Sequence, residues 1–224
     1  MKKIALATFL LCSSFVAIAG EAEIRKSLEG RMGKVESLTR TPLAGLWEAS
    51  IDGQVFYTDD KGEYILAGNL LELKSGKNLT ALRQFNALPL DLALKQVRGS
   101  GKNVLVTFED PNCGFCKKLA KELQTVKNVT IYTFIYPVLG EDSNDKSQAI
   151  WCSPDRTKAW NDWMLTGKTP PAKPAKCDLA GLEKSIELGR KLHVNGTPAL
   201  IFATGERVGG YIPATEIEKR FKAN

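Results

Sequence analysis

The chain is poor in the residues that bind metal ions. His193 is the only histidine among 224 residues, and there is a single CxxC motif, Cys113-Gly114-Phe115-Cys116. Structural zinc sites use two such pairs, or cysteine and histidine at characteristic spacings. Cys152 and Cys177 could complete a four-thiolate site, but they are far apart and lack zinc-ligand spacing. The sequence therefore predicts no metal site, and a catalytic role for the histidine is also disfavoured.

Long hydrophobic runs are also absent, because no segment approaches the roughly 18 uninterrupted apolar residues of a membrane span. The beginning of the chain has instead the three parts of a secretory signal: Met1-Lys2-Lys3, the apolar residues 4–16, and Ala17-Ile18-Ala19. An uncleaved anchor or a lipoprotein is the alternative, but Cys12 lies inside the apolar run and not at a cleavage point. We expect cleavage after residue 19 and export to an oxidising compartment.

Charge of one sign is not concentrated anywhere in the chain. The formal net charge is +6, and removal of Lys2 and Lys3 lowers it to +4, since residues 1–19 contain no acidic residue. The remaining lysines and arginines are interleaved with acids, as on an ordinary solvated surface. Nucleic acid is therefore not an expected partner.

Cysteines are few, and cleavage changes their count from five to four by removing Cys12. An even number in an exported protein suggests two pairs. The CxxC motif is one pair, which leaves Cys152 with Cys177. Closing a loop of about 26 residues stabilises a fold by roughly 3.5 kcal/mol in the chain-entropy model. We expect one reactive pair and one structural pair.

The CxxC motif follows an apolar run, residues 104–108, and opens an amphipathic stretch, residues 117–123. A strand that leads into a helix places Cys113 at the helix start, where free backbone N–H groups and the helix dipole stabilise a thiolate. A thiolate is the species that attacks a disulfide. Cys116, one turn later, is placed to resolve the mixed disulfide. An inert structural disulfide and half of a metal site are the alternatives.

The two halves of the mature chain have different patterns. Residues 35–74 alternate as short strands joined at turns such as Asp52-Gly53, which predicts β-hairpins with a thin core. This small sheet either packs on the second domain or contacts a partner. Residues 80–98 have a broken helical pattern, with a kink or a fresh helix at Pro89. Gly99-Ser100-Gly101 is interpreted as a flexible hinge.

The second half has a βαβ pattern, followed by a helical insertion and by a helix, a hairpin and a final helix. The expected second strand spans residues 129–136, and the insertion spans residues 143–166 with Trp151, Trp160 and Trp163 as core residues. A helix over 179–192, a strand over 199–202 and a helix over 213–222 complete the pattern. The predicted fold class is α+β, with an antiparallel β domain before an α/β domain.

Three segments together resemble the DsbC/DsbG family of bacterial thiol:disulfide interchange proteins. They are residues 108–116, which contain the CxxC motif, residues 149–152, and residues 194–199, which contain Gly196-Thr197-Pro198. The resemblance covers essentially the whole mature chain. It implies a signal peptide over 1–19, a small cystatin-like dimerisation domain over 20–79, a linker helix over 80–98, and a thioredoxin-like catalytic domain over 99–224.

The resemblance also implies roles for individual residues. Cys113 would be the attacking thiolate and Cys116 the resolving thiol, and Pro198 matches a cis-proline that lies against the dithiol and offers backbone groups to substrate. Further matches are Thr197 as a residue that tunes the thiols, Gly114 and Phe115 between the cysteines, the structural disulfide of Cys152 and Cys177, and Gly68 at the dimer contact. Phe115 replaces a tyrosine of the better-known family member, and Pro89 is a departure expected to alter the linker.

The family function implied is disulfide isomerisation in the periplasm of a Gram-negative bacterium. The expected partners are misfolded exported proteins with wrong disulfides, a DsbD-type membrane reductase as electron donor, and a second copy of the chain. No cofactor is expected beyond the redox-active cysteines. A DsbG-like chaperone or thiol reductase and a DsbA-like dithiol oxidase are the alternatives. Glu109 and Asp110 could assist proton transfer, although we expect them to cap the helix and face solvent.

Overall fold

The computed structural model describes the backbone of residues 13–222 and the side chains of residues 20–222. The predicted signal peptide thus lies largely outside the described residues, and its cleavage stays a prediction. The chain divides into two compact units, the first ending at Gly68 and the second beginning at Asn69. None of the helices in the described part of the chain is long and apolar enough to cross a membrane.

The first unit is one helix and a four-stranded antiparallel sheet of order β1-β2-β3-β4. The elements are α1 (Ser13–Met32), β1 (Val35–Arg40), β2 (Leu46–Ile51), β3 (Gln54–Asp59) and β4 (Ile65–Leu66). Asp52 and Gly53 both have positive φ, 50° and 73°, and connect Ile51 to its partner Gln54. These are the dihedral signs of a two-residue hairpin turn, so the predicted turn is confirmed.

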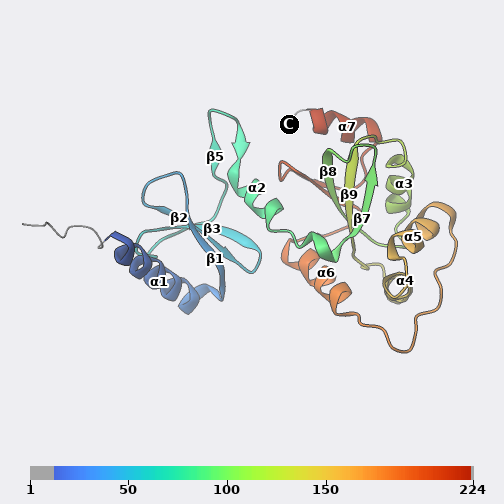
Figure 1. Cartoon of the computed structure of the whole chain (residues 1–224), viewed down its shortest axis with the longest axis horizontal. Coiled ribbons are helices and arrows are strands. Elements are labelled where there is room, and N and C mark those ends of the chain that lie inside the picture. Colours follow the sequence, from blue (N-terminus) through green and yellow to red (C-terminus); the bar gives the residue numbers. More distant parts are fainter. Residues whose placement is uncertain (1–12, 223–224) are drawn as a thin grey trace, which may run out of the picture. The chain divides into compact units, whose positions relative to one another are not determined.

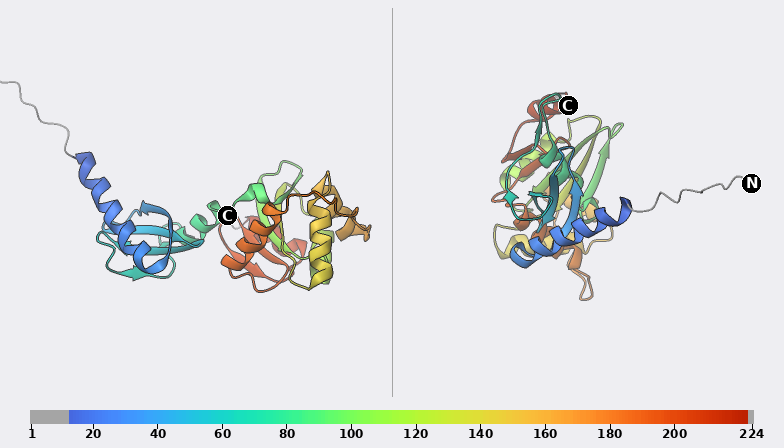
Figure 2. Two further views of the ribbon diagram at one scale, coloured as in Figure 1. Left: turned by 90° about the horizontal axis from the view of Figure 1, so that it is seen from below. Right: turned by 90° about the vertical axis from the view of Figure 1, so that its left-hand side faces the viewer.

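The core of the first unit lies between α1 and the sheet. Ile24 and Leu28, one helical turn apart, are buried against inward residues of β1 and β2, among them Trp47 and Ala49. Figures 1 and 2 show α1 lying across the strands of this unit. The alternation of β2, in which every second residue is buried, confirms that one face of the sheet packs on the helix.

The second unit is built on a five-stranded sheet of order β11-β10-β8-β9-β7. Strands β8 and β9 are parallel, and the other neighbours are antiparallel. Its strands and helices are β5 (Leu71–Glu72), β6 (Lys77–Asn78), α2 (Leu79–Asn86), the 3₁₀ turn η1 (Leu90–Leu92), β7 (Leu94–Arg98), β8 (Asn103–Glu109), α3 (Gly114–Glu122), β9 (Val129–Ile135), α4 (Glu141–Trp151), α5 (Arg156–Asn161), the π-helix η2 (Asp162–Thr166), α6 (Ala180–Lys191), β10 (Ala199–Phe202), β11 (Arg207–Gly209) and α7 (Ala214–Lys222).

Helices cover both faces of this sheet. Leu119 of α3 and Ile217 of α7 pack with Leu105 of β8 on one face, whereas Val106 and Phe108 belong to the cluster on the other face, with residues of α6. Figure 1 shows α3 and α6 on opposite sides of the strands. A strand buried on both faces explains why the sequence of β8 is an almost continuous apolar run. The α+β class predicted from the sequence is confirmed.

The linker helix predicted over residues 80–98 is wrong in its second half. Helix α2 ends at Asn86, a 3₁₀ turn follows Pro89, and residues 94–98 form β7. Proline cannot donate the backbone hydrogen bond that would continue the helix. Strand β7 then pairs with β9, from Leu94–Thr133 to Arg98–Val129, which is a long-range contact that local periodicity does not reveal.

The flexible hinge expected at Gly99-Ser100-Gly101 is also wrong. This segment lies within the second unit and connects β7 to β8 of the same sheet. Gly99 and Gly101 have positive φ, and a Cβ on either would collide with Asn128 or Thr130. The amide of Ser100 donates to Asn128 Oδ1 at 3.0 Å. The glycines therefore permit a tight, packed turn.

The insertion predicted as helix over residues 143–166 is helical in three pieces. Helix α4 ends at Trp151, α5 begins at Arg156, and the π-helix follows α5 directly. The break contains Pro154, and the residue before a proline disfavours helical backbone. Trp151 and Trp160 are buried, so the prediction that they are core residues is confirmed, and Trp163 packs against the same cluster.

Candidate active site

Strand β8 and helix α3 position the two thiols. Cys113 is the N-cap of α3, with extended backbone at φ −70° and ψ 117°, and its Sγ accepts a hydrogen bond from the amide of Cys116 at 3.4 Å. A side chain at an N-cap satisfies one of the free N–H groups of the first turn. The predicted strand–helix arrangement around the CxxC motif is thus present, and both cysteines are free thiols in this structure.

Thr197 and Pro198 lie against Cys113, although the sequence separates them widely. The Cys113 thiol donates to the carbonyl oxygen of Thr197 at 3.2 Å across 84 positions. Pairing of β10 with β8, in which Ala199 is opposite Phe108, brings the two segments together. The Thr197–Pro198 peptide bond is cis, as the resemblance implied. The amide of Gly210 donates a hydrogen bond to the carbonyl oxygen of Pro198 at 2.8 Å.

Cys116 is embedded in the protein core. It is fully buried and belongs to a cluster with Ala120, Ile150, Trp160 and Met164. Burial raises the pKa of the Cys116 thiol far above its usual range, and the charge of Glu109 adds to this effect. The two thiols therefore differ in kind: Cys113 receives an amide hydrogen bond at a helix start, whereas Cys116 is held as a neutral thiol in apolar surroundings.

Glu109, the last residue of β8, is a buried carboxyl beneath the dithiol. Its Oε1 accepts from the hydroxyl of Thr107 at 2.7 Å, and that hydroxyl also lies 3.0 Å from the hydroxyl of Thr133. Oε2 is buried without a hydrogen-bond partner. Burial raises the pKa of Glu109 to about 7. The expectation that this residue faces solvent is wrong, because β8 is buried on both faces.

Asp110 is buried as well, and it ties three segments together. Its Oδ1 accepts from the amide of Asn112 at 2.7 Å and from the hydroxyl of Ser143 at 2.8 Å. Its Oδ2 accepts from the amides of Val138 and Leu139 at 2.7 and 3.0 Å. The expectation that Asp110 caps α3 and faces solvent is therefore wrong. The carboxylate fixes the loop before the dithiol to the loop that connects β9 and α4.

The residues between the two cysteines point outward. A Cβ on Gly114 would meet no atom within 4 Å, and the ring of Phe115 is 63 % exposed. On the flank of this helix, Lys117 Nζ lies 4.3 Å from the centre of the Trp163 ring. The indole of Trp163 donates to the carbonyl oxygen of Pro111 at 2.6 Å. The π-helix thus supports the loop that leads into the dithiol.

Cys152 and Cys177 form a disulfide with a Cα–Cα distance of 5.9 Å and a sequence separation of 25. The segment that it closes contains α5 and the π-helix, which pack around Cys116 and Ala120. The two cysteines themselves pack against this cluster. The second pair therefore secures the part of the fold that lies behind the reactive pair.

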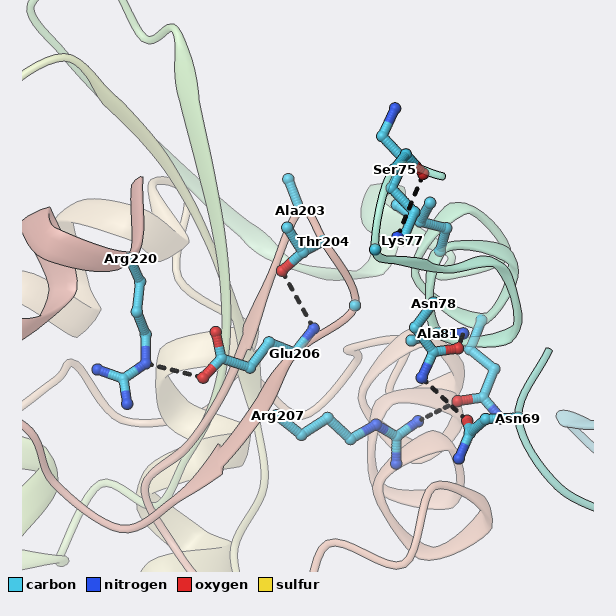
Figure 3. Close-up of a pocket in the computed structure, with 14 residues that line it drawn as sticks. Asn69, Ser75, Lys77, Asn78, Ala81, Ala203, Thr204, Glu206, Arg207 and Arg220 are labelled. Carbon is cyan, nitrogen blue, oxygen red and sulfur yellow. Dashed lines mark hydrogen bonds and ion pairs between the residues drawn. The ribbon is translucent and has the colours of Figure 1, made fainter. Parts of the chain in front are cut away.

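The histidine and the large cavity of the second unit are not part of the dithiol site. His193 is exposed at the end of α6, with φ 54°. Within residues 20–222, no three His, Cys, Asp or Glu side chains gather as metal ligands would. A cavity of about 880 Å³ lies between the β5–β6 hairpin and the β10–β11 turn (Figure 3). Lys77, Arg207 and the ion pair of Arg220 with Glu206 line it, but neither thiol does. The dithiol is the site that carries chemistry.

Two family models match the chain, one on each part. Residues 15–81 match the disulfide bond isomerase protein N-terminal domain, and residues 90–224 match a thioredoxin-like domain. The second match spans more than half of the chain. The sheet flanked by helices on both faces is thus a thioredoxin-like domain, as the resemblance implied.

The chain is similar to curated and solved proteins of one kind. It is 45 % identical over 193 residues to the probable thiol:disulfide interchange protein DsbC of Bordetella parapertussis, covering 83 % of this chain and 68 % of that protein. It is 31 % identical over 224 residues to DsbC of Escherichia coli, covering 96 % and 92 %. A disulfide interchange protein from Neisseria gonorrhoeae has 40 % identity and a TM-score of 0.57, covering 61 % of this chain and 98 % of that one. The chain belongs to the DsbC family of thiol:disulfide interchange proteins and is a thiol:disulfide oxidoreductase or isomerase.

Proposed function

We propose that this protein is a periplasmic disulfide isomerase that rearranges wrong disulfides in exported proteins through Cys113 and Cys116. The observation that carries the proposal is the hydrogen bonding of Cys113 Sγ, which meets the Cys116 amide and the Thr197 carbonyl at 3.4 and 3.2 Å. The Cys116 amide at the helix N-terminus favours a thiolate on Cys113, whereas the Thr197 carbonyl, which accepts from the protonated thiol, places a backbone group of another segment beside the sulfur, where an extended substrate strand would lie.

The first step is attack by the Cys113 thiolate on one sulfur of a substrate disulfide. The S–S bond of the substrate breaks, a bond forms between Cys113 and that sulfur, and the other substrate sulfur leaves as a thiolate. In isomerisation, a different substrate thiolate then attacks the bound substrate sulfur. It forms the new substrate disulfide and releases Cys113 as a thiolate, so that the enzyme undergoes no net redox change.

Reduction is the competing outcome. Cys116 must lose its proton and attack the sulfur of Cys113, which closes the enzyme disulfide and releases the substrate as a dithiol, two electrons richer. The raised pKa of Cys116 disfavours that step, because a neutral thiol is a poor nucleophile. A mixed disulfide that is resolved slowly gives a substrate thiol time to attack. The buried position of Cys116 therefore supports isomerisation.

The remaining parts of the proposal concern compartment, partners and organisation. An oxidising compartment demands an electron donor that keeps the dithiol reduced, for which a DsbD-type membrane reductase is proposed. The first unit, which ends at Gly68, supplies homodimerisation, and the second unit, which contains both reactive thiols, carries catalysis. Thr197 and Pro198 receive the substrate backbone, with Gly114 and Phe115 beside them.

The test is reactivation of a scrambled multi-disulfide protein by catalytic amounts of the reduced enzyme. We expect recovery of activity with the wild type and loss of recovery in Cys113→Ser. If only reduced, unpaired substrate is rescued, and only by the oxidised enzyme, the protein is a DsbA-like oxidase. If Cys113→Ser retains the full effect of the wild type by suppressing aggregation, a DsbG-like chaperone function explains the activity instead.

A further inference from the structure

Val138 and Leu139, in the loop between β9 and α4, expose apolar side chains at the edge of the candidate active site. They are 46 % and 57 % exposed. They lie after Pro137, where the apolar strand has ended, and before Gly140, whose φ is 105°. Exposed apolar side chains are ordinary on a protein surface, so the significance of this pair depends on its fixed position beside the reactive thiol.

The loop that carries them is fixed, since both backbone amides donate to the buried Asp110 carboxylate at 2.7 and 3.0 Å. The other oxygen of that carboxylate holds Asn112, the residue before Cys113, at 2.7 Å. The N-terminal turn of α4 is joined to the same group by Ser143 at 2.8 Å. The apolar pair is therefore held at a constant position relative to the reactive thiol.

A second contact fastens the same two loops. The side-chain amide of Asn112 donates to Oδ2 of Asp142, the second residue of α4, at 2.7 Å. The two loops are thus joined twice, through the Asp110 carboxylate and through the Asn112 side chain. A surface of this kind binds with a small loss of conformational entropy, because its parts are already ordered.

Cys113 is nearly buried, so a substrate sulfur reaches it only if the chain around that sulfur lies on the surface surrounding the thiol. Phe115, two residues after the reactive thiol, is a further exposed apolar side chain near it, at 63 % exposure. We propose that Val138 and Leu139 form a subsite that takes an apolar side chain next to the reacting cysteine of an extended, unfolded polypeptide. This proposal rests on the proposed function and adds a substrate preference to it.

The preference follows from the chemistry of the pair. Apolar area removed from water stabilises the encounter in proportion to that area, so a leucine beside the substrate cysteine gains affinity that a serine does not. In a folded substrate such leucines are mostly buried, and in an unfolded one they are exposed. The subsite would therefore direct the thiolate toward cysteines in chain that has not folded correctly.

The experiment measures the rate at which the reduced full-length enzyme cleaves peptide disulfides. Two peptides carry the same chromogenic thiol on their single cysteine and differ only in having leucine or serine beside it. A small chromogenic disulfide reports the intrinsic reactivity of Cys113. We expect the wild type to cleave the leucine peptide about tenfold faster than the serine peptide, the effect of one well-buried aliphatic side chain.

The double variant Val138→Ser/Leu139→Gln should lose this difference and still react with the small disulfide at the wild-type rate within about twofold. Leu73→Gln is the matched control, because Leu73 is 95 % exposed on the turn between β5 and β6. The Leu73→Gln variant should keep the wild-type preference for the leucine peptide. A leucine preference that survives in the double variant, or none in the wild type, overturns the subsite. Absence of any reaction of the wild type with the small disulfide would overturn the proposed function itself.

Discussion

At the scale of single residues, Glu109 stands out because an ionisable carboxyl ends a buried strand. One oxygen is satisfied by Thr107, the other has no partner, and burial raises its pKa to about 7. The charge of this group also raises the pKa of Cys116, after the larger effect of burial. A base that gains a proton near neutral pH, coupled to a thiol that must lose one, is suited to accept the proton of Cys116 during resolution.

The raised pKa makes stability depend on pH. Between the ordinary pKa of 4.5 and the folded value of about 7, the folded state holds a proton that the unfolded state has lost. Stability therefore falls as pH rises through this window and stays lower above it, by about 3 kcal/mol. Glu109→Gln removes the charged form. We expect its advantage over the wild type in free energy of unfolding to grow by about 2.5 kcal/mol from about pH 5 to about pH 8.

Denaturant unfolding at a series of pH values measures this difference. Glu63→Gln, which changes an exposed carboxylate in the first unit, is the control and should follow the wild-type profile. An advantage of Glu109→Gln that is independent of pH would show that the folded and unfolded proteins release this proton at the same pH, so that folding does not raise the pKa of Glu109. It would also remove the reason to assign it a role in proton transfer.

The burial of Glu109 was available from the sequence but was missed there. In a strand, residues two apart lie on the same face. Glu109 is four positions after Leu105 and two after Thr107, and all three are buried. Extending the alternation of the apolar run to its end would have placed the carboxyl inside. Asp110 gave no such signal, because three of its four hydrogen bonds come from the distant residues Val138, Leu139 and Ser143.

At the scale of elements, locally encoded features were predicted well and long-range pairing was not. The hairpin turn at Asp52-Gly53 and the start of α3 at the CxxC motif depend on neighbouring residues, and both are present. Strand β7 forms because its backbone pairs with the edge of β9. The sequence of residues 94–98 alone does not indicate this pairing. The meeting of Cys113 with Thr197 was predicted only through the family resemblance, since no local pattern joins positions so far apart.

The contact of α2 with the β10–β11 turn depends on Gly205. Its φ is +80°, and a Cβ there would lie 2.2 Å from the backbone carbonyl of Ala81 in α2. Gly205→Ala should therefore both strain the turn and displace the helix. We expect the free energy of unfolding to fall by about 2–4 kcal/mol. Hydrogen exchange should show that amide protection falls most in α2.

Gly167→Ala separates these two effects. Gly167 has a similar φ of +73°, but nothing lies within 4 Å of its added Cβ. The free energy of unfolding of this variant should fall by about 1 kcal/mol, which is the cost of a positive φ for alanine alone. Equal losses in the two variants would mean that the turn does not hold α2 in place, and that the close approach at Ala81 is relieved without cost.

The disulfide of Cys152 and Cys177 closes the segment that carries α5 and the π-helix. With a separation of 25 residues, its loss is expected to lower the free energy of unfolding by about 3.5 kcal/mol. The measurement is urea unfolding of Cys152→Ala/Cys177→Ala, a double variant that leaves no unpaired thiol at the site. A loss below about 1 kcal/mol would mean that the packing of Trp160 and Met164 alone holds the segment.

At the scale of the whole molecule, the first unit has an open edge. Strand β4 pairs with β3 on one side only, and Tyr64, Ile65 and Leu66 are exposed there. Edge strands with apolar side chains are templates for pairing with another chain. Gly68, which the resemblance assigns to the dimer contact, follows two residues later and has open space around it. In the proposed homodimer, a second copy of the chain covers this edge.

Lysine at this edge should therefore separate the dimer. Ile65→Lys/Leu66→Lys places two like charges at the proposed contact of each copy, so we expect a monomer at micromolar concentration where the wild type sediments as a dimer. Leu43→Lys, another exposed apolar position of the first unit, is the control and should remain dimeric. A double variant that still sediments as the wild type would place the dimer contact away from β4.

A monomeric variant also allows two activities to be compared: the reaction of the dithiol with a small disulfide, and the reactivation of a scrambled protein. The monomeric variant retains Cys113, Thr197 and the whole second unit, so its reaction with a small disulfide should match the wild type within about twofold. Reactivation of a scrambled protein should fall by about tenfold or more, because two linked sites hold a substrate at higher effective concentration than one. Equal reactivation by monomer and dimer would show that one dithiol unit suffices for isomerisation, and that the first unit serves another purpose.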